Sequence, residues 1–393
     1  MIRKLIFSFL GLHLISSCAF CASPEDILNR LTLEQKVGQL FIIRPEQLHP
    51  DYNSRIKAKE AGSKSINAKG KDDGIVRDVL TDDMRKFMRK YPAGGFALFG
   101  LNIKTPAQLK KFTGDLDSLS NQLVDVPAIM AIDEEGGRVA RIANNSNFNV
   151  ERISNAASLG KTHDAINARN SGSTIGKYLK DYGFTLNFAP VADINTNPKN
   201  IVIGVRAFGS SPSLVSRMCG EFINGLHSQG ISGCLKHFPG HGDTHGDTHK
   251  GTVSVSKTWK QLLKAEMIPY LENLGKADSI MTAHITMKGI TKDGLPASLS
   301  YEVVTEKLRN ELGYKGVIIT DALDMGAIVK KYGAGRAAVL AFQAGNDILL
   351  LPRDYPAAFN AVLKAVREGK ISETRLNESV LRILELKYKR LDS

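Results

Sequence analysis

The chain has 393 residues, of which 42% are hydrophobic and 23% are charged, as in an ordinary globular protein. This length suffices for one large α/β barrel or two smaller domains, without a disulfide scaffold. The net charge of +12 permits attraction to anionic surfaces, but no basic helix with interleaved aromatic residues is visible, so nucleic-acid binding is not expected. Cys219 and Cys234 are predicted to be small buried residues, with a disulfide between them as the alternative.

The amino terminus is typical of an export signal. Two basic residues precede a short apolar stretch at 5–15, which is too short to span a bilayer. The segment Ile15-Ser16-Ser17-Cys18 then resembles a bacterial lipoprotein box, in which the cysteine becomes the lipidated first residue. We therefore expect residues 1–22 to be a signal peptide. The mature protein would be periplasmic or on the outer surface, anchored to the membrane by lipid on Cys18. Ordinary cleavage near Ala22 is the alternative.

The mature chain, residues 23–393, opens with two helix signals. Ser23-Pro24-Glu25-Asp26 combines a cap, a first-turn proline and two acids, and Thr32-Leu33-Glu34-Gln35 is a capping box. Short apolar runs then alternate with amphipathic stretches. The runs predicted to be strands are 38–43, 94–99, 128–133, 184–193, 231–238, 279–285, 316–321 and 347–351.

Continuous apolar strands alternating with helices indicate a parallel sheet covered on both faces. Eight such units predict a TIM-type (β/α)8 barrel that forms a single catalytic domain, with a doubly wound open sheet as the alternative. Polar residues cluster where the strands end, which is where barrel enzymes carry their active sites. They are Asp133, Asp193, Lys236, His237, His284 and Asp321. No dinucleotide fingerprint or Walker loop is visible, and no cofactor is expected.

One segment, at about 44–90, departs from the compact pattern. It is long, polar and rich in charge, and it separates the first two predicted strands. We predict an insertion in the barrel domain with a helix around 80–90. It is either a solvated surface excursion or a rim over the site, since long loops at barrel mouths often carry function.

The segment from Lys236 to His249 is the most informative part of the sequence. It follows a predicted buried strand and contains glycines that permit a tight backbone path. Its histidines stand at positions 237, 241, 245 and 249. On a helix this spacing would align them for metal, but Pro239 and the glycines oppose a continuous helix, so no metal site is expected. A merely solvated polar loop is the other alternative.

This loop resembles the signature of glycoside hydrolase family 3, in its β-N-acetylglucosaminidase branch. There Lys-His-Phe-Pro-Gly-His-Gly is followed by a short spacer and Asp-Ser-His. The stretch 132–141 resembles the family's Asp-x-Glu-Gly-Gly-Arg-Val segment, 317–325 its nucleophile strand, and 204–209 its arginine loop. The resemblance covers nearly all of the mature chain except 44–90. It implies a single-domain TIM-barrel enzyme that acts on carbohydrate without a cofactor, and we expect a monomer.

The resemblance also implies the catalytic residues. Asp321 would be the nucleophile that attacks the anomeric carbon. Most retaining glycosidases add a second carboxylate, but this branch uses a histidine supported by an aspartate, which here are His249 and Asp247. Imidazole has an ordinary pKa of about 6.5, so it can give and take a proton near neutral pH. His245 is the alternative acid/base, and Thr248 replaces the more usual serine.

Substrate binding is expected from Asp133, Arg141, Arg206, Lys236 and His237. A carboxylate at a strand end can accept hydrogen bonds from two adjacent sugar hydroxyls, which suits Asp133, although it could instead cap the following turn. Arg141 could equally serve an ion pair. Asp324 is expected to point elsewhere and to cap the helix that follows.

These features predict an exo-acting, retaining β-N-acetylglucosaminidase with peptidoglycan fragments as its substrate class. A phosphorylase or another family 3 β-glycosidase is the first alternative, because a histidine acid/base lacks the negative charge that would repel phosphate. A non-catalytic glycan-binding lipoprotein and a metal-dependent hydrolase are the remaining ones.

Overall fold

The computed structural model describes residues 22–60, 75–244 and 253–389. Within them, parallel strands form an eight-stranded sheet in the order β10-β1-β2-β3-β4-β5-β7-β9. The strands are β1 (Phe41–Ile43), β2 (Gly95–Leu98), β3 (Ile129–Ile132), β4 (Leu186–Asn187), β5 (Ser232–Phe238), β7 (Ser279–Thr282), β9 (Val317–Thr320) and β10 (Leu349–Leu350). Each lies within one of the eight predicted runs, so all eight strand predictions are confirmed.

The sheet closes into a barrel where β9 meets β10. A parallel bridge joins Ile319 and Ile348. The Ile348 amide donates to the carbonyl of Ile318 at 3.0 Å, and the Thr320 amide donates to the carbonyl of Ile348 at 3.0 Å. On its other side β10 pairs with β1. The predicted TIM-type barrel is therefore confirmed, and the open-sheet alternative is wrong.

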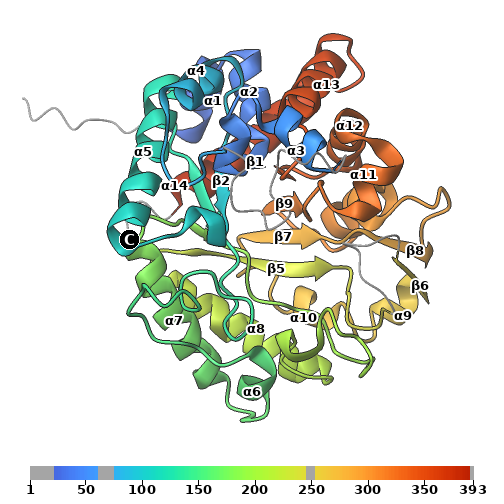
Figure 1. Cartoon of the computed structure of the whole chain (residues 1–393). Coiled ribbons are helices and arrows are strands. Elements are labelled where there is room, and N and C mark those ends of the chain that lie inside the picture. The colour runs from blue at the N-terminus through green and yellow to red at the C-terminus, as the bar shows by residue number, and fades with distance from the viewer. Residues whose placement is uncertain (1–21, 61–74, 245–252, 390–393) are drawn as a thin grey trace, which may run out of the picture.

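Helices cover the outside of the barrel (Figure 1). They are α1 (Pro24–Arg30), α2 (Leu33–Gln39), α3 (Tyr52–Glu60), α4 (Asp82–Lys90), α5 (Pro106–Val124), α6 (Ala156–Gly160), α7 (Ala165–Asp181), α8 (Pro212–His227), α9 (Trp259–Leu262), α10 (Ile268–Leu271), α11 (Gly326–Tyr332), α12 (Ala334–Ala344), α13 (Tyr355–Arg367) and α14 (Glu373–Tyr388), with a π-helical segment, η5 (Glu302–Glu311). Ser23 caps α1 and Thr32 caps α2, as predicted, and both helices begin with a capping box. In the part of the chain that the structure describes, no helix is long and apolar enough to cross a membrane.

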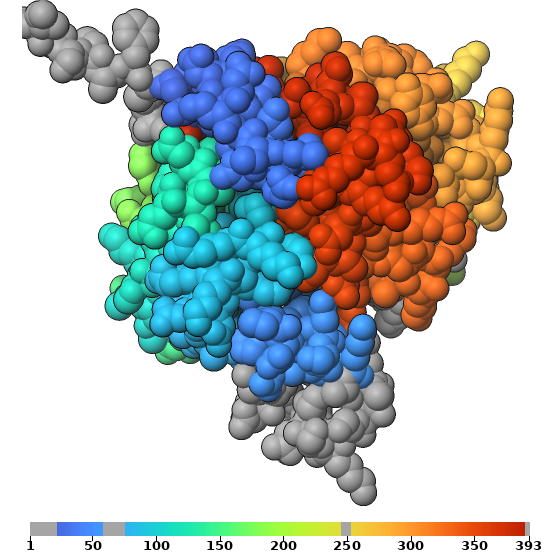
Figure 2. All heavy atoms as spheres, turned by 90° about the horizontal axis from the view of Figure 1, so that it is seen from above, coloured from blue at the N-terminus to red at the C-terminus, as the bar shows by residue number. Residues whose placement is uncertain are grey.

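The two ends of the chain meet along one seam of the barrel. Figure 2 shows the N-terminal segment, in blue, beside the C-terminal helices, in red. The ring of Phe41 on β1 lies 5.3 Å from that of Tyr355 and 6.3 Å from that of Phe359, both on α13. Aromatic burial at this seam stabilises the closed barrel.

Elsewhere in the core Cys219 and Cys234 are buried and free, as predicted.

The predicted excursion at 44–90 is anchored on the barrel at both ends. A short 3-10 helix, η1 (Pro45–Leu48), is buried throughout. Helix α4 confirms the predicted helix and buries Met84 and Met88 completely. Residues 61–74 lie outside the described ranges. The solvated-excursion alternative is wrong for the two ends, because their apolar side chains pack into the core.

A second, two-stranded sheet was not predicted. It pairs β6 (Val253–Thr258) with β8 (Ile285–Gly289), in parallel. In Figure 1 the arrows of β5 and β7 point toward it, so it lies at the carboxyl end of the barrel. Along β6, buried Val253 and Val255 alternate with exposed Ser254 and Ser256. Such a half-exposed strand has no continuous apolar run, which is the pattern on which the other strand predictions depended.

Candidate active site

A pocket of about 290 Å³ opens at the carboxyl ends of the barrel strands. Its lining includes all six predicted site residues that the structure describes. They are Asp133, Arg141, Arg206, Lys236, His237 and Asp321. Asp247, His249 and the alternative His245 lie outside the described residues. The barrel therefore brings side chains from β3, β4, β5 and β9, or from the loops that follow these strands, together into one site.

Asp321 stands at the mouth of the barrel, as predicted. It follows the fully buried strand β9. Its amide donates to the carbonyl of Thr282 on β7 at 2.9 Å, and its Oδ1 accepts from the amide of Ala322 at 2.8 Å. Both bonds fix the backbone on which the carboxylate is carried. The carboxylate is partly exposed to the pocket, where an incoming ligand can reach it.

Lys236 lies at the centre of an ion cluster on the floor of the pocket. Its Nζ is 2.7 Å from Asp133 Oδ1 and 2.7 Å from Glu135 Oε1. The side chain is only 2% exposed. Burial opposes its positive charge, but the two carboxylates outweigh burial and raise the pKa of Lys236. Arg141 Nη2 lies 3.5 Å from Asp133 Oδ2. Asp133 is thus held by cations in the pocket rather than by the following turn, and the turn-cap alternative is wrong.

Arg206 and Glu135 form a bidentate pair beside this cluster. Arg206 Nε donates to Glu135 Oε2 at 2.8 Å and Nη2 donates to Oε1 at 2.7 Å. Burial alone would raise the pKa of Glu135, but Lys236 and Arg206 hold it well below its ordinary range. Glu135 was not among the predicted site residues. Its position two residues after Asp133, in the same strand-end segment, was the available signal.

Glu134, which lies between Asp133 and Glu135 in the sequence, supports the turn that carries Arg141. Its carboxylate accepts from the amides of Ile142 at 3.1 Å and Ala143 at 2.9 Å, and from the hydroxyl of Tyr178 at 3.0 Å. Burial raises the pKa of Glu134 in spite of these donors. The three contacts orient the turn, so Glu134 is a positioning residue for Arg141.

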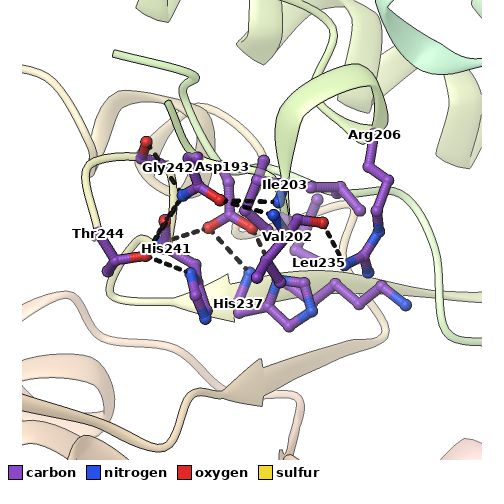
Figure 3. A network of polar contacts seen from close by, with 12 residues as sticks. Asp193, Val202, Ile203, Arg206, Leu235, His237, His241, Gly242 and Thr244 are labelled. Atoms are coloured by element: carbon purple, nitrogen blue, oxygen red, sulfur yellow. Dashed lines mark hydrogen bonds and ion pairs between the residues drawn. The ribbon is translucent and has the colours of Figure 1, made fainter. Parts of the chain in front are cut away.

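His237 is oriented by Asp193, at the end of the neighbouring strand (Figure 3). Asp193 Oδ2 lies 2.7 Å from His237 Nδ1, and its Oδ1 accepts from the amide of His241 at 2.6 Å. The carboxylate is buried, which disfavours its charge. The two histidines outweigh burial and lower the pKa of Asp193. A carboxylate acceptor at Nδ1 makes that nitrogen the protonated one.

The loops after β4 and β5 are tied together by Asn200. Its Nδ2 donates to the carbonyl of His241 at 2.8 Å, and its Oδ1 accepts from the amides of Val202 and Ile203 at 3.0 Å each. At Gly242 an added Cβ would lie 1.8 Å from the carbonyl oxygen of Ile194, so only glycine permits this approach. These contacts therefore hold the described part of the histidine-rich loop, residues 236–244, in place.

Arg44 and Asp324 form an ion pair on the opposite wall of the pocket, and this corrects one prediction. Asp324 does not cap the next helix, since α11 has Met325 at its cap position and no side-chain cap bond. Arg44 also places its guanidinium 4.9 Å from the centre of the Phe99 ring. Arg44 follows β1 directly, so the strand-end rule could have found it. Arg44 was instead predicted to be the first residue of the polar insertion at about 44–90.

The arrangement suits a small polyhydroxylated ligand. A partly exposed carboxylate, Asp321, shares the pocket with a fixed array of cations and hydrogen-bonding groups, while Phe99, Phe188 and Met281 add apolar surface. Within the described ranges, no group of three or more His, Cys, Asp or Glu is placed to hold a metal ion.

Comparison with known sequences gives consistent matches. The family profile described as the glycosyl hydrolase family 3 N-terminal domain matches residues 32–386. Beta-hexosaminidase A of Pseudoalteromonas piscicida is 34% identical over 336 residues, which are 79% of this chain and 56% of that protein. The chain thus spans about half the length of that relative. Beta-hexosaminidase LpqI of Mycobacterium tuberculosis is 32% identical over 321 residues, which are 79% of each protein.

Comparison with solved structures agrees. A glycoside hydrolase family 3 β-N-acetylglucosaminidase from Paenibacillus sp. str. FPU-7 superposes with a TM-score of 0.81 at 37% identity, covering 92% of this chain and 64% of that one. A family 3 glycosyl hydrolase from Mycobacterium smegmatis superposes with a TM-score of 0.72 at 28% identity, covering 92% of this chain and 98% of that one.

Proposed function

This chain belongs to glycoside hydrolase family 3, and on that premise we propose that it is an exo-acting, retaining β-N-acetylglucosaminidase. It would release terminal β-linked N-acetylglucosamine. The relatives named beta-hexosaminidase and the Paenibacillus β-N-acetylglucosaminidase support this activity. Asp321 carries the proposal, because its carboxylate opens into the pocket at the carboxyl end of β9.

In the proposed mechanism Asp321 attacks the anomeric carbon. The bond from that carbon to the glycosidic oxygen breaks, and a covalent glycosyl-aspartate forms. His249, supported by Asp247, gives a proton to the leaving oxygen. It then takes a proton from the water that hydrolyses the ester. The second displacement returns the β configuration, so the stereochemistry is retained.

The polar floor of the pocket would hold the sugar. We assign Asp133, Arg141, Arg206, Lys236 and His237 to its hydroxyl groups. Their ion pairs fix each side chain before the ligand arrives, so little rotamer entropy remains to be lost on binding. The small volume of the pocket, about 290 Å³, supports action at a chain end rather than along a polymer.

We further propose peptidoglycan fragments as the source of the substrate and an exported, monomeric protein that is lipidated on Cys18. The amino-terminal residues 1–22, with their lipoprotein-like segment, support export. A net charge of +12 would favour residence near anionic envelope polymers.

One assay tests the function. The purified chain is offered aryl β-N-acetylglucosaminide, β-glucoside and β-xyloside, each with and without phosphate. The proposal expects preference for the first substrate and free sugar as the product in both buffers. Sugar 1-phosphate formed only with phosphate would identify a phosphorylase. Absence of turnover on all three would favour a glycan-binding protein, and loss of activity on chelation would favour a metal-dependent enzyme.

A further inference from the structure

A second cavity lies at the amino end of the barrel, opposite the active site. It has a volume of about 200 Å³, and its lining includes the first residues of three strands, Ile129 of β3, Leu186 of β4 and Ser232 of β5. Residues of α5 and α14 complete the lining, and in Figure 1 both helices lie toward the tails of the β5 and β7 arrows. None of the described residues assigned to the sugar site lines this cavity.

The cavity is open to solvent on one side and closed on the other. Gly114, Gly183 and Thr185 are exposed at its mouth, whereas Met130 and Ser232 are buried. A small molecule can therefore enter without unfolding of the barrel. The buried apolar part of the lining consists of Ala128, Ile129, Met130, Leu186 and Leu386. Such walls suit the apolar body of a ligand.

Lys387, near the end of α14, also lines the cavity and is only 9% exposed. The described chain has two buried lysines, and the other one, Lys236, is held by Asp133 and Glu135. Among the described residues Lys387 has no carboxylate partner. Its Nζ donates to Gln39 Oε1 at 2.6 Å. A buried ammonium without an anion is costly, so this lysine lacks the partner that its charge requires.

Gln39 has an unused donor at the same place. Its side chain is fully buried, and its Nε2 has no hydrogen-bond partner among the described residues. Because Nε2 and Oε1 belong to one amide group, the unpartnered N–H groups lie close to the ammonium of Lys387. A carboxylate has two oxygens that accept hydrogen bonds, so one carboxylate can satisfy both donors.

The charge balance of the cavity limits the ligand to one negative charge. Asp117 on α5 is the only other ionisable residue in the lining. Its Oδ1 accepts from the amide of Ala128 at 2.8 Å and its Oδ2 accepts from Asn121 Nδ2 at 3.1 Å. Its charge acts on Lys387 without a hydrogen bond between the two. Asp117 would repel a ligand with several negative charges, such as a phosphate, whereas one carboxylate matches one lysine.

Binding of an anion here is expected to depend on pH. Burial lowers the pKa of Lys387 to about 7, and Asp117 opposes this shift. Below that pH the ammonium is charged and attracts a carboxylate, and above it the folded chain releases the proton. Affinity for a carboxylate should therefore decrease as the pH rises above about 7.

We propose that the cavity at the amino end of the barrel binds a small monocarboxylic acid with an apolar body. The carboxylate pairs with Lys387 and accepts from Gln39 Nε2, and the body lies against the apolar walls. This site is distinct from the sugar site, and the proposal does not depend on the glycosidase function.

Calorimetric titration of the whole chain with butyrate at about pH 6.5 tests the proposal, with 1-butanol and butylamine as the uncharged and cationic controls. Butyrate should bind more tightly than both, and Lys387→Met should weaken its binding about 10- to 100-fold. Lys364→Met, at a site that is 72% exposed, is the matched control and should leave binding unchanged. Equal binding of butyrate and butanol, or unchanged binding in Lys387→Met, would overturn the proposal.

A second pair of variants tests the location of the ligand without changing a buried charge. Gly114 lies on α5 at the mouth of the cavity, and an added Cβ there meets no atom within 4 Å, so larger residues are compatible with the fold. Gly114→Phe covers the entrance and should weaken butyrate binding about fivefold or more, whereas Gly114→Ala should leave it within about twofold. Equal affinities in these two variants would place the ligand elsewhere and contradict the proposal.

The pH profile provides the third measurement. Affinity of the wild-type chain for butyrate should decrease by up to about tenfold per pH unit above pH 7, because only the protonated lysine attracts the carboxylate. The remaining affinity of Lys387→Met should be constant over the same range. A wild-type affinity that does not change between about pH 6.5 and 8.5 would show that Lys387 does not hold the ligand.

Discussion

Lys236 and Asp133 are 103 positions apart in the chain, yet Lys236 Nζ donates to Asp133 Oδ1 at 2.7 Å on the floor of the pocket. Glu135 completes the contact at 2.7 Å. The lysine is buried, and the carboxylates that it neutralises belong to a different strand end. This ion pair therefore links β3 to β5, in addition to the hydrogen-bonded sheet that contains both strands.

Lys236→Met should destabilise the protein by about 3–5 kcal/mol, because Asp133 and Glu135 would lose the buried cation that they share and would each keep only one arginine. The matched control is Lys111→Met. Lys111 makes an ion pair of the same length, 2.7 Å to Asp115, but is 72% exposed. That change should cost less than about 1 kcal/mol. Urea unfolding of the three proteins provides the measurement. Similar losses in the two variants would mean that burial of the Lys236 cluster is not what stabilises it.

Asp321→Asn should reduce turnover of aryl β-N-acetylglucosaminide by on the order of 10³ or more, since an amide cannot form the glycosyl ester. The fold should be retained, because the amide nitrogen of Asp321 and its bond to Thr282 are unaffected. Circular dichroism and thermal unfolding serve as the folding control. Activity close to wild type in a folded variant would remove Asp321 from the nucleophile role.

His249→Ala should slow substrates with poor leaving groups most, because those depend on protonation of the glycosidic oxygen. A substrate with an acidic phenol should lose less in the first step, and added azide should restore part of the second. His245→Ala is the matched variant and should have the smaller effect on both substrates. The opposite ranking would move the acid/base role to His245.

Lys387 makes stability depend on pH. It is buried at the end of α14 with Gln39 Oε1 2.6 Å away, and burial lowers its pKa to about 7. Between about pH 7 and 10.5 the unfolded chain holds a proton that the folded chain has released, so stability rises with pH across this window. Below pH 7 both states are protonated and the full cost of burying the charge applies.

Lys387→Met should therefore stabilise the protein at pH 7, by on the order of a few kcal/mol, and abolish the rise toward pH 10. Urea unfolding at pH 7, 8.5 and 10 measures both effects. Lys364→Met, at a site that is 72% exposed, is the control and should leave the pH dependence unchanged. A wild-type curve that is flat over this range would show that Lys387 titrates normally.

Mass spectrometry of protein isolated from its native membrane tests the export prediction. A diacylglyceryl-modified Cys18 at the amino terminus is expected, and Cys18→Ser should abolish membrane association. An unmodified terminus at Ala22 or Ser23 would identify ordinary secretion instead.

Sequence alone located the eight barrel strands and most of the pocket. Buried parallel strands are continuous apolar runs, so 38–43 or 316–321 can be recognised without tertiary information. The polar residue after each run marks the same edge of the barrel, which is why Asp133, Lys236 and Asp321 were found. Strand β6 was not predicted, because one of its faces is exposed and its sequence therefore has no continuous apolar run. The roles of Asp247 and His249 stay predictions.

Only the tertiary structure decided which of these side chains contact one another. The pairing of Arg44 with Asp324 requires that the segments after β1 and β9 meet, and this depends on closure of the barrel between β9 and β10. From the sequence alone, Asp193 could equally have faced solvent. In the structure, β5 and the loop after it place two histidines at its carboxylate. Sequence spacing specifies the direction of a strand and the residue at its end. The distances and hydrogen-bond directions among those residues depend on packing between distant segments, which local patterns do not contain.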